Sequence, residues 1–231
     1  MDRIVRFALA PLLLAQALRT RKTALILPEA AGPRAGQAGT GPRLRLLVLG
    51  DSSAAGVGVD HQDQALSGHL VRALSTDFSV EWQLLASTGA TSSDALSVLP
   101  QATPLDVAVL ALGVNDVTRL TSPQRFVHHQ RQLLQGLRDR GARLICVTAI
   151  PPMGEFPLLP NPLRWTLGRH ASRLQQMRAA HLADFAGYHP LDFDLPPDPA
   201  LMPEDGFHPG PEVYRLWAQT AAQTIRTHWT K

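Results

Sequence analysis

The sequence has one cysteine, no long apolar run and no cluster of metal-binding side chains. With Cys146 alone, the 231-residue chain cannot form an internal disulfide framework or a zinc site built from several thiolates. The apolar run near the N-terminus is eight residues long, far short of the roughly 20 residues that a membrane-spanning helix needs. No group of His, Asp or Glu has the spacing of metal ligands, so neither a metal nor a cofactor is expected.

The charge of the chain is concentrated in its first part. Hydrophobic residues make up 45% of the chain and charged residues 18%, which is ordinary for a globular protein. Residues 1–43 hold seven Lys and Arg against two acidic residues, which leaves 15 basic against 17 acidic residues in 44–231. A slightly acidic body lacks the basic face that neutralises phosphates, so nucleic acid is not an expected partner.

Residues 1–22 combine basic residues with an apolar run that contains Leu12, Leu13 and Leu14. We expect a short helix that lies on a membrane surface or on the domain, with these leucines buried and the arginines solvated. A cleaved export signal is the alternative, although Pro11 interrupts the run and basic residues follow it. The expected location is therefore cytoplasmic, with peripheral membrane contact through residues 1–22, and export remains open.

Residues 28–43 are rich in Gly, Pro and Ala, a composition typical of a linker. We therefore divide the chain into an N-terminal arm with its linker over residues 1–43 and one domain over residues 44–231. Nothing in the pattern indicates the oligomeric state.

After residue 43 the chain alternates between apolar runs and segments of helical periodicity. The apolar runs predict five strands, at Leu44–Leu49, Val80–Ala86, Val107–Leu112, Leu144–Ile150 and, more weakly, His189–Phe193. Helices are predicted over Leu66–Leu74, from Ser92 or Ser93 to Leu99, from Ser122-Pro123 to about Arg140, from Asn161-Pro162 to about Phe185, and over Pro211–His228. This alternation is typical of a mostly parallel sheet in a three-layer α/β/α domain.

Ligands of such a sheet bind beyond the carboxyl ends of its strands. The residues there are Gly50-Asp51-Ser52-Ser53, Ser87-Thr88-Gly89, Gly113-Val114-Asn115-Asp116 and Pro151-Pro152. A serine directly after a buried strand is well placed to be a nucleophile, provided that a base activates it.

A candidate base lies far along the chain, in Asp205-Gly206-Phe207-His208-Pro209. A carboxylate three residues before an imidazole can accept its Nδ1–H and leave Nε2 to take a serine proton. Asn115 and the backbone amide of Gly89 could stabilise an oxyanion. Together these residue types predict a site for acyl transfer.

These blocks resemble, in order and spacing, the four motif blocks of the SGNH (GDSL) hydrolase family, over residues 46–210. The resemblance implies a flavodoxin-like sheet of about five strands, in agreement with the strand count. Ser53 stands where the family commonly has leucine, which leaves the mechanism unchanged. Ser52 has no Gly-x-Ser-x-Gly around it, which argues against the nucleophile elbow of α/β-hydrolases.

The resemblance also implies a role for each matched residue. Ser52 corresponds to the nucleophile, His208 to the general base and acid, and Asp205 to the residue that orients the imidazole. The backbone amides of Ser52 and Gly89 and the side-chain amide of Asn115 correspond to the oxyanion hole. The implied activity is hydrolysis of acyl esters through an acyl-enzyme on Ser52, without a cofactor.

Two proline-rich segments are expected to border this site. Pro151–Trp165 follows a strand, and its apolar side chains predict an acyl-chain channel lined by Met153, Phe156, Leu158 and Leu159. Phe193–Met202 leads into the Asp205–His208 loop and predicts the opposite wall. Few aromatic or amide side chains suited to sugars occur there, so a lipid or small-molecule ester with a short- to medium-chain acyl group is favoured. Carbohydrate O-deacetylation, thioester hydrolysis and an inactive binding module of the same fold stay open, as does a merely covering role for both segments.

Overall fold

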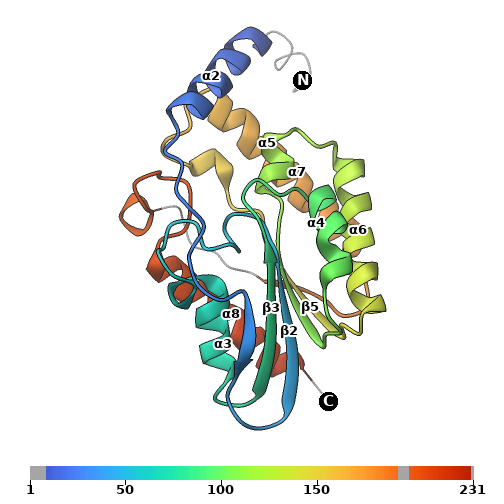
Figure 1. Ribbon diagram of the computed structural model, residues 1–231. Coiled ribbons are helices and arrows are strands. Elements are labelled where there is room, and N and C mark those ends of the chain that lie inside the picture. Colours follow the sequence, from blue (N-terminus) through green and yellow to red (C-terminus); the bar gives the residue numbers. More distant parts are fainter. Residues whose placement is uncertain (1–8, 192–197, 230–231) are drawn as a thin grey trace.

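A computed structural model describes residues 9–191 and 198–229 of the chain (Figure 1). In this part of the chain six strands form one sheet, in the order β1-β3-β2-β4-β5-β6. Strands β2 to β6 run parallel, whereas β1 is antiparallel to β3. The predicted three-layer α/β fold with a mostly parallel, flavodoxin-like sheet is confirmed, with one strand more than expected.

The strands are β1 (Ala35–Ala38), β2 (Arg43–Gly50), β3 (Ser79–Ala86), β4 (Val107–Ala111), β5 (Leu144–Thr148) and β6 (Tyr188–Leu191). The helices are α2 (Ala10–Thr23), α3 (Leu66–Leu74), α4 (Ser92–Val98), α5 (Val114–Thr118), α6 (Pro123–Asp139), α7 (Leu163–Leu182) and α8 (Pro211–His228), with 3₁₀ turns η1 (Gln62–Gln64), η2 (Leu99–Gln101), η3 (Met153–Glu155) and η4 (Pro199–Leu201). The predicted elements agree with these bounds to within three residues, and the end of the predicted strand at Phe193 lies outside the described residues.

The extra strand comes from the segment 28–43, for which the linker prediction was wrong. Ala35–Ala38 pairs with β3, from Ala35 opposite Gln83 to Ala38 opposite Val80. The pairing uses backbone hydrogen bonds, which need no particular side chains, so small residues without an apolar alternation can still form an edge strand. Local composition therefore gave no sign of it.

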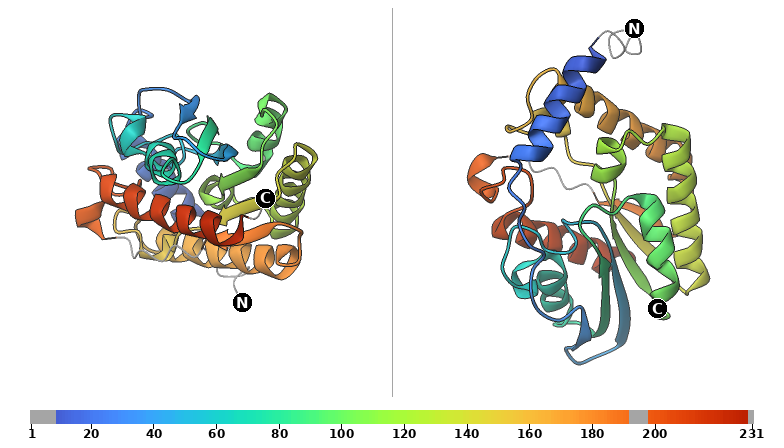
Figure 2. Two further views of the ribbon diagram at one scale, coloured as in Figure 1. Left: turned by 90° about the horizontal axis from the view of Figure 1, so that it is seen from below. Right: turned by 45° about the horizontal axis from the view of Figure 1, so that its top comes forward.

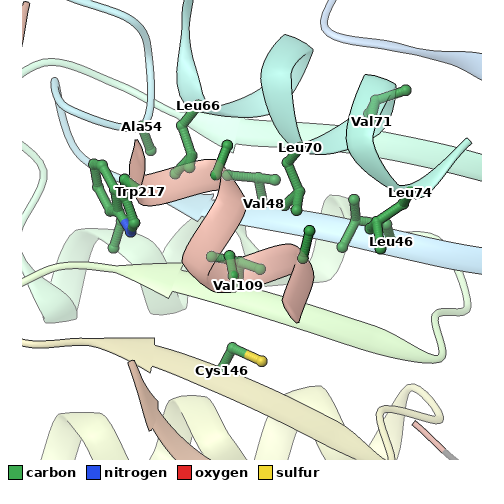
Figure 3. Packing of buried hydrophobic residues seen from close by; sticks show 14 of the residues in the cluster. Leu46, Val48, Ala54, Leu66, Leu70, Val71, Leu74, Val109, Cys146 and Trp217 are labelled. Carbon is green, nitrogen blue, oxygen red and sulfur yellow. The ribbon is translucent and has the colours of Figure 1, made fainter. Parts of the chain in front are cut away.

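Two layers of helices bury the two faces of the sheet. Helices α3 and α8 cover one face, and α4, α6 and the end of α7 cover the other. Figure 3 shows Leu66 and Leu70 of α3 packed over Val48 of β2, with Trp217 of α8 nearby. Cys146 of β5 belongs to the same cluster, and burial raises the pKa of its thiol to about 12. This cysteine is a core residue, consistent with its place in an apolar strand.

Caps explain where two of the helices begin. Ser122, where a helix was predicted to begin, caps α6 by accepting a hydrogen bond from the backbone amide of Arg125. Helix α4 is capped by Thr91, not by Ser92 or Ser93, through a capping box with Asp94.

Helix α2 extends from the end of the molecule toward which the strands point (Figures 1 and 2). None of its residues is buried. Leu13 packs against an apolar cluster of the domain, whereas Leu12 and Leu14 are exposed, so the three leucines are not buried together on the domain. Among the described residues, no helix has the length and apolarity to cross a membrane.

Candidate active site

Ser52 lies in a sharp turn at the carboxyl end of β2. The amide of Asp51 donates to the carbonyl of Ala111 at the end of β4, which keeps the turn on the sheet. Only glycine fits at position 50, because a Cβ there would lie 2.6 Å from that same Ala111 carbonyl oxygen. The chain then curls back, with the amide of Val57 donating to the Ser52 carbonyl, and this leaves the Ser52 side chain at the edge of the sheet.

The structure brings Ser52, His208 and Asp205 together across 156 residues of chain. The Oγ of Ser52 lies 2.8 Å from Nε2 of His208, and Nδ1 of His208 lies 2.5 Å from Oδ2 of Asp205. The other oxygen of Asp205 accepts the backbone amides of Phe207 and His208, at 3.0 and 3.1 Å. The carboxylate is therefore held by its own loop while it holds the imidazole.

This arrangement suits proton transfer. With Nδ1–H donating to Asp205, Nε2 of a neutral imidazole is free to accept the proton of the Ser52 hydroxyl. The Asp205 side chain is 4% exposed, so water does not compete with the imidazole for it. A hydroxyl, a base and an orienting carboxylate thus stand in the order that an activated serine requires.

Within the described part of the chain, the backbone amides of Ser52 and Gly89 have no acceptor. Gly89 has a φ of +81°, a conformation that favours glycine. Its carbonyl accepts a 2.8 Å hydrogen bond from Nη2 of Arg119, whose Nη1 lies 3.6 Å from Asp94. Arg119 had no motif to mark it, yet it fastens the loop on which the predicted oxyanion donor lies.

Asn115, the third predicted oxyanion donor, lies on α5 directly after β4. Its Nδ2 is 3.1 Å from the carbonyl oxygen of Ala90 and 3.4 Å from Oδ2 of Asp51. The shorter bond orients the amide, and the longer contact with Asp51 is the weaker of the two.

Asp51 itself was not among the predicted site residues. Its carboxylate is buried, and this burial raises its pKa, while hydrogen bonds from the amide and hydroxyl of Ser53 act in the opposite direction. The position of Asp51 between Gly50 and Ser52 indicates an acid beside the nucleophile. The sequence does not show that its side chain points into the protein.

Asp116 is bonded to α4 and not to Ser52. Its Oδ2 accepts hydrogen bonds from the amide and hydroxyl of Ser92, at 2.9 and 2.7 Å, and Gln130 of α6 donates to that hydroxyl. This buried network fastens α5, and with it Asn115, to the neighbouring helices.

A cavity of about 620 Å³ opens beside Ser52 and His208. Its apolar lining includes Leu112, Val114, Ile150, Phe156, Met202, Phe207 and Trp217. Thr148 and Gln175 add polar groups, and Oε1 of Gln175 is held by the amide of Ile150 and by the buried guanidinium of Arg178. A volume of this size suits a small organic ligand with a largely apolar body.

The four predicted channel residues occupy different places. Phe156 lines the cavity. Met153 and Leu159 are 0% and 7% exposed in an apolar cluster that also contains Ile150 and Phe156 of the lining, but contrary to the prediction neither of them lines the cavity. Leu158 is exposed and lies over Gly206. A Cβ added to Gly206 would be 2.7 Å from Cδ1 of Leu158. An apolar run with several prolines does not by itself reveal which side chain faces inward.

The opposite wall agrees in part with the sequence. Leu201 and Met202 line the cavity, whereas Phe193, at the other end of the predicted segment, lies outside the described residues. The sequence did not predict three further lining residues, Thr148, Gln175 and Trp217. In the sequence, a polar residue on a helix or at a strand end looks like a solvent-facing residue, and a tryptophan on a helix looks like a core residue. In residues 9–191 and 198–229, no group of three or more His, Cys, Asp or Glu side chains is placed to hold a metal ion.

Known proteins resemble this chain in sequence and in fold. Residues 48–216 match the GDSL-like lipase/acylhydrolase family. A GDSL-like esterase of Mycobacterium tuberculosis is 29% identical over an alignment of 202 residues, and the match covers 81% of this chain and 63% of that relative's length. The crystal structure of TesA superposes with a TM-score of 0.66 at 22% identity, over 79% of this chain and 98% of its own. The structure of an aryl esterase of M. smegmatis superposes with a TM-score of 0.61 at 18% identity. This match covers 80% of this chain and 100% of the esterase chain. At these identities the two structures show a shared fold.

Proposed function

Because the chain belongs to the GDSL-like lipase/acylhydrolase family, we propose that it is a serine carboxylic ester hydrolase acting on short- to medium-chain acyl esters. The observation that carries the proposal is the chain of contacts from Ser52 to His208 to Asp205, at 2.8 and 2.5 Å. The proposed function uses the chain's own side chains and backbone amides, without a cofactor.

In the first step the Oγ of Ser52 attacks the ester carbonyl carbon while its proton moves to Nε2 of His208. The carbonyl oxygen becomes an oxyanion, which the amides of Ser52 and Gly89 and the side chain of Asn115 stabilise. Collapse of this intermediate breaks the bond to the alcohol oxygen, and His208 returns its proton to the departing alcohol. The acyl group is then bound to Ser52.

In the second step a water molecule attacks the acyl carbon and gives its proton to Nε2 of His208. The same donors stabilise the second oxyanion, and its collapse releases the carboxylic acid as the proton returns to Oγ of Ser52. Asp205 remains a carboxylate throughout and stabilises the imidazolium that forms in each half of the reaction.

The cavity supports an acyl ester as the substrate. Phe156, Met202 and Trp217 provide an apolar surface beside Ser52, which suits an acyl chain better than a sugar ring. Thr148 and Gln175 offer polar contacts to a distal group of the same substrate.

The test is hydrolysis of p-nitrophenyl esters from acetate to palmitate by wild type and Ser52→Ala. We expect an optimum beyond acetate and a loss of about 10⁴-fold or more in Ser52→Ala. Ser97→Ala, an exposed serine on α4, is the matched control and should retain wild-type turnover. Activity that survives Ser52→Ala would contradict the proposal. A serine-dependent optimum at acetate would instead favour an O-deacetylase.

A further inference from the structure

Large apolar side chains are exposed mainly at one end of the molecule. Of the eight exposed in the described residues, three lie on α2 and two directly follow it: Leu12, Leu14, Leu18, Leu25 and Ile26. Two more, Leu158 and Trp165, lie just before and on the first turn of α7. An accumulation of this kind, rather than a scattering, marks an interaction surface.

Helix α2 is attached to the domain by few contacts. The side chain of Gln16 donates to the carbonyl of Asn161 at 2.7 Å and accepts the amide of Leu163 at 3.1 Å, which places α2 against the start of α7. Within the described residues this contact and the packing of Leu13 connect the centre of α2 to the domain, and Leu14 and Leu18 remain 61% and 58% exposed. Apart from Leu13, the leucines of α2 thus stay largely uncovered by the described part of the chain.

Cations lie among these apolar groups. Arg21 and Lys22 are in the last turn of α2. Arg164 and Arg173 line a groove of about 680 Å³ on α7, together with Trp165, and none of the described residues that line it is acidic. In the described part of the chain no carboxylate lies within 4.0 Å of the guanidinium of Arg164 or Arg173. Guanidinium groups of this kind bind phosphate well.

We propose that this end of the molecule, formed by α2 and the first part of α7, docks on an anionic phospholipid surface. The leucines of α2 with Leu158 and Trp165 would enter the interfacial region, while Arg164 and Arg173 bind lipid phosphates. Charge complementarity favours this occupant over a second copy, because two copies joined through this face would bring like charges together. Since residues 44–231 carry a slight negative charge, the attraction must come from this end.

The docked orientation has a consequence for the site. Ser172 and Gln176 line both the arginine groove and the cavity beside Ser52, so the two hollows are neighbours along α7. An ester in the lipid surface would therefore reach Ser52 along a short path. This consequence rests on the proposed ester hydrolysis, whereas the docking itself does not.

The test uses full-length Ser52→Ala protein, which cannot hydrolyse the lipid, in sedimentation with vesicles. The vesicles are phosphatidylcholine alone or with one third phosphatidylglycerol. We expect co-sedimentation with the anionic vesicles that weakens at high salt, and at least tenfold weaker binding for Leu14→Ser/Leu18→Ser and for Arg164→Gln/Arg173→Gln. Arg43→Gln/Arg72→Gln is the matched control, because it removes two charges near the amino ends of the strands and should bind as before.

The same substitutions in the active protein separate docking from catalysis. Each should leave turnover of soluble p-nitrophenyl butyrate unchanged while turnover of a vesicle-borne ester falls. Failure of the soluble assay in wild type would refute the proposed hydrolysis and leave the sedimentation result standing. Equal binding to neutral and anionic vesicles, or unchanged binding in both double variants, would overturn the docking proposal. So would a stable dimer in size-exclusion chromatography that Leu14→Ser/Leu18→Ser dissociates.

Discussion

The two ends of the sheet distribute polar and apolar side chains in opposite ways. At the amino ends of the strands charged residues pair near the solvent, as Arg43 does with Glu81 and Arg226 with Asp77, at 2.6 and 2.9 Å. At the carboxyl ends Asp51 and Asp116 are buried, while leucines of α2 lie exposed beyond them. The amino end follows the usual preference of soluble proteins, and the carboxyl end departs from it.

This difference separates residues that maintain the fold from residues that serve a site. Burying a polar group costs free energy unless hydrogen bonds replace those made with water, and exposed leucines gain nothing from the hydrophobic effect. The carboxyl end has both buried acids and exposed leucines, each unfavourable for stability. Ser52, His208 and the cavity lie at this same end. Substitutions at this end should therefore affect activity most, and those at the amino end should affect it least.

After Ser52→Ala, the largest of these effects is expected for Asn115→Ala. Loss of one oxyanion donor typically lowers kcat by 10²–10³-fold, and we expect a loss of that order for the soluble ester. Thermal unfolding of the same sample should show a folded protein, because within the described residues the side chain of Asn115 is bonded only to the Ala90 carbonyl and, weakly, to Asp51. A wild-type kcat in the folded variant would exclude Asn115 from the site.

The next effect is on stability at the same end. Asp116→Ala leaves the amide and hydroxyl of Ser92 without their buried acceptor. It also removes a negative charge that favours the charged form of the buried Arg178 guanidinium. We expect the free energy of unfolding in urea to fall by about 1–3 kcal/mol. Asp116→Asn keeps an acceptor oxygen and should lose less. Unchanged stability in both variants would show that the network does not fasten α5.

A smaller, pH-dependent effect is expected near the amino end of β6. The ring of His189 lies 4.2 Å from that of His228, and burial, together with His228, lowers the pKa of His189. As pH falls below the ordinary value of 6.5, the unfolded chain takes up this proton before the folded one, so stability decreases with acidification.

His189→Gln should therefore reduce the fall in Tm between pH 7 and pH 5, measured by circular dichroism. His128→Gln, at an exposed position on α6, is the control and should follow wild type. A decline in His189→Gln as steep as in wild type would contradict the assignment.

The smallest effect is expected for Arg43→Gln. Its ion pair with Glu81 joins side chains that are 64% and 38% exposed, and such pairs contribute little in water. Activity and Tm should match wild type when measured beside Asn115→Ala. A clear loss of either would mean that the two ends differ less than their burial indicates.

Local signals were sufficient for most of the fold. Helices α3 and α8 begin and end at the predicted residues. The signals that mark them are local, namely apolar spacing in both helices and the N-terminal proline of α8. The edge strand β1 could not be predicted in this way, because its partner Val80–Gln83 lies more than 40 residues away. Likewise, the spacing of Met153, Phe156 and Leu159 gives no sign that only Phe156 lines the cavity.

By itself the sequence determined the order of strands and helices, and it placed a serine, an asparagine and an Asp-x-x-His pair after strands or before the last helix. Those features depend on neighbours a few residues apart. Only the tertiary structure decided that Nε2 of His208 meets the hydroxyl of Ser52, that Asp116 binds Ser92, and that the leucines of α2 stay exposed. Such contacts join distant parts of the chain, and the packing of whole layers selects which side chain is buried and which is left to bind.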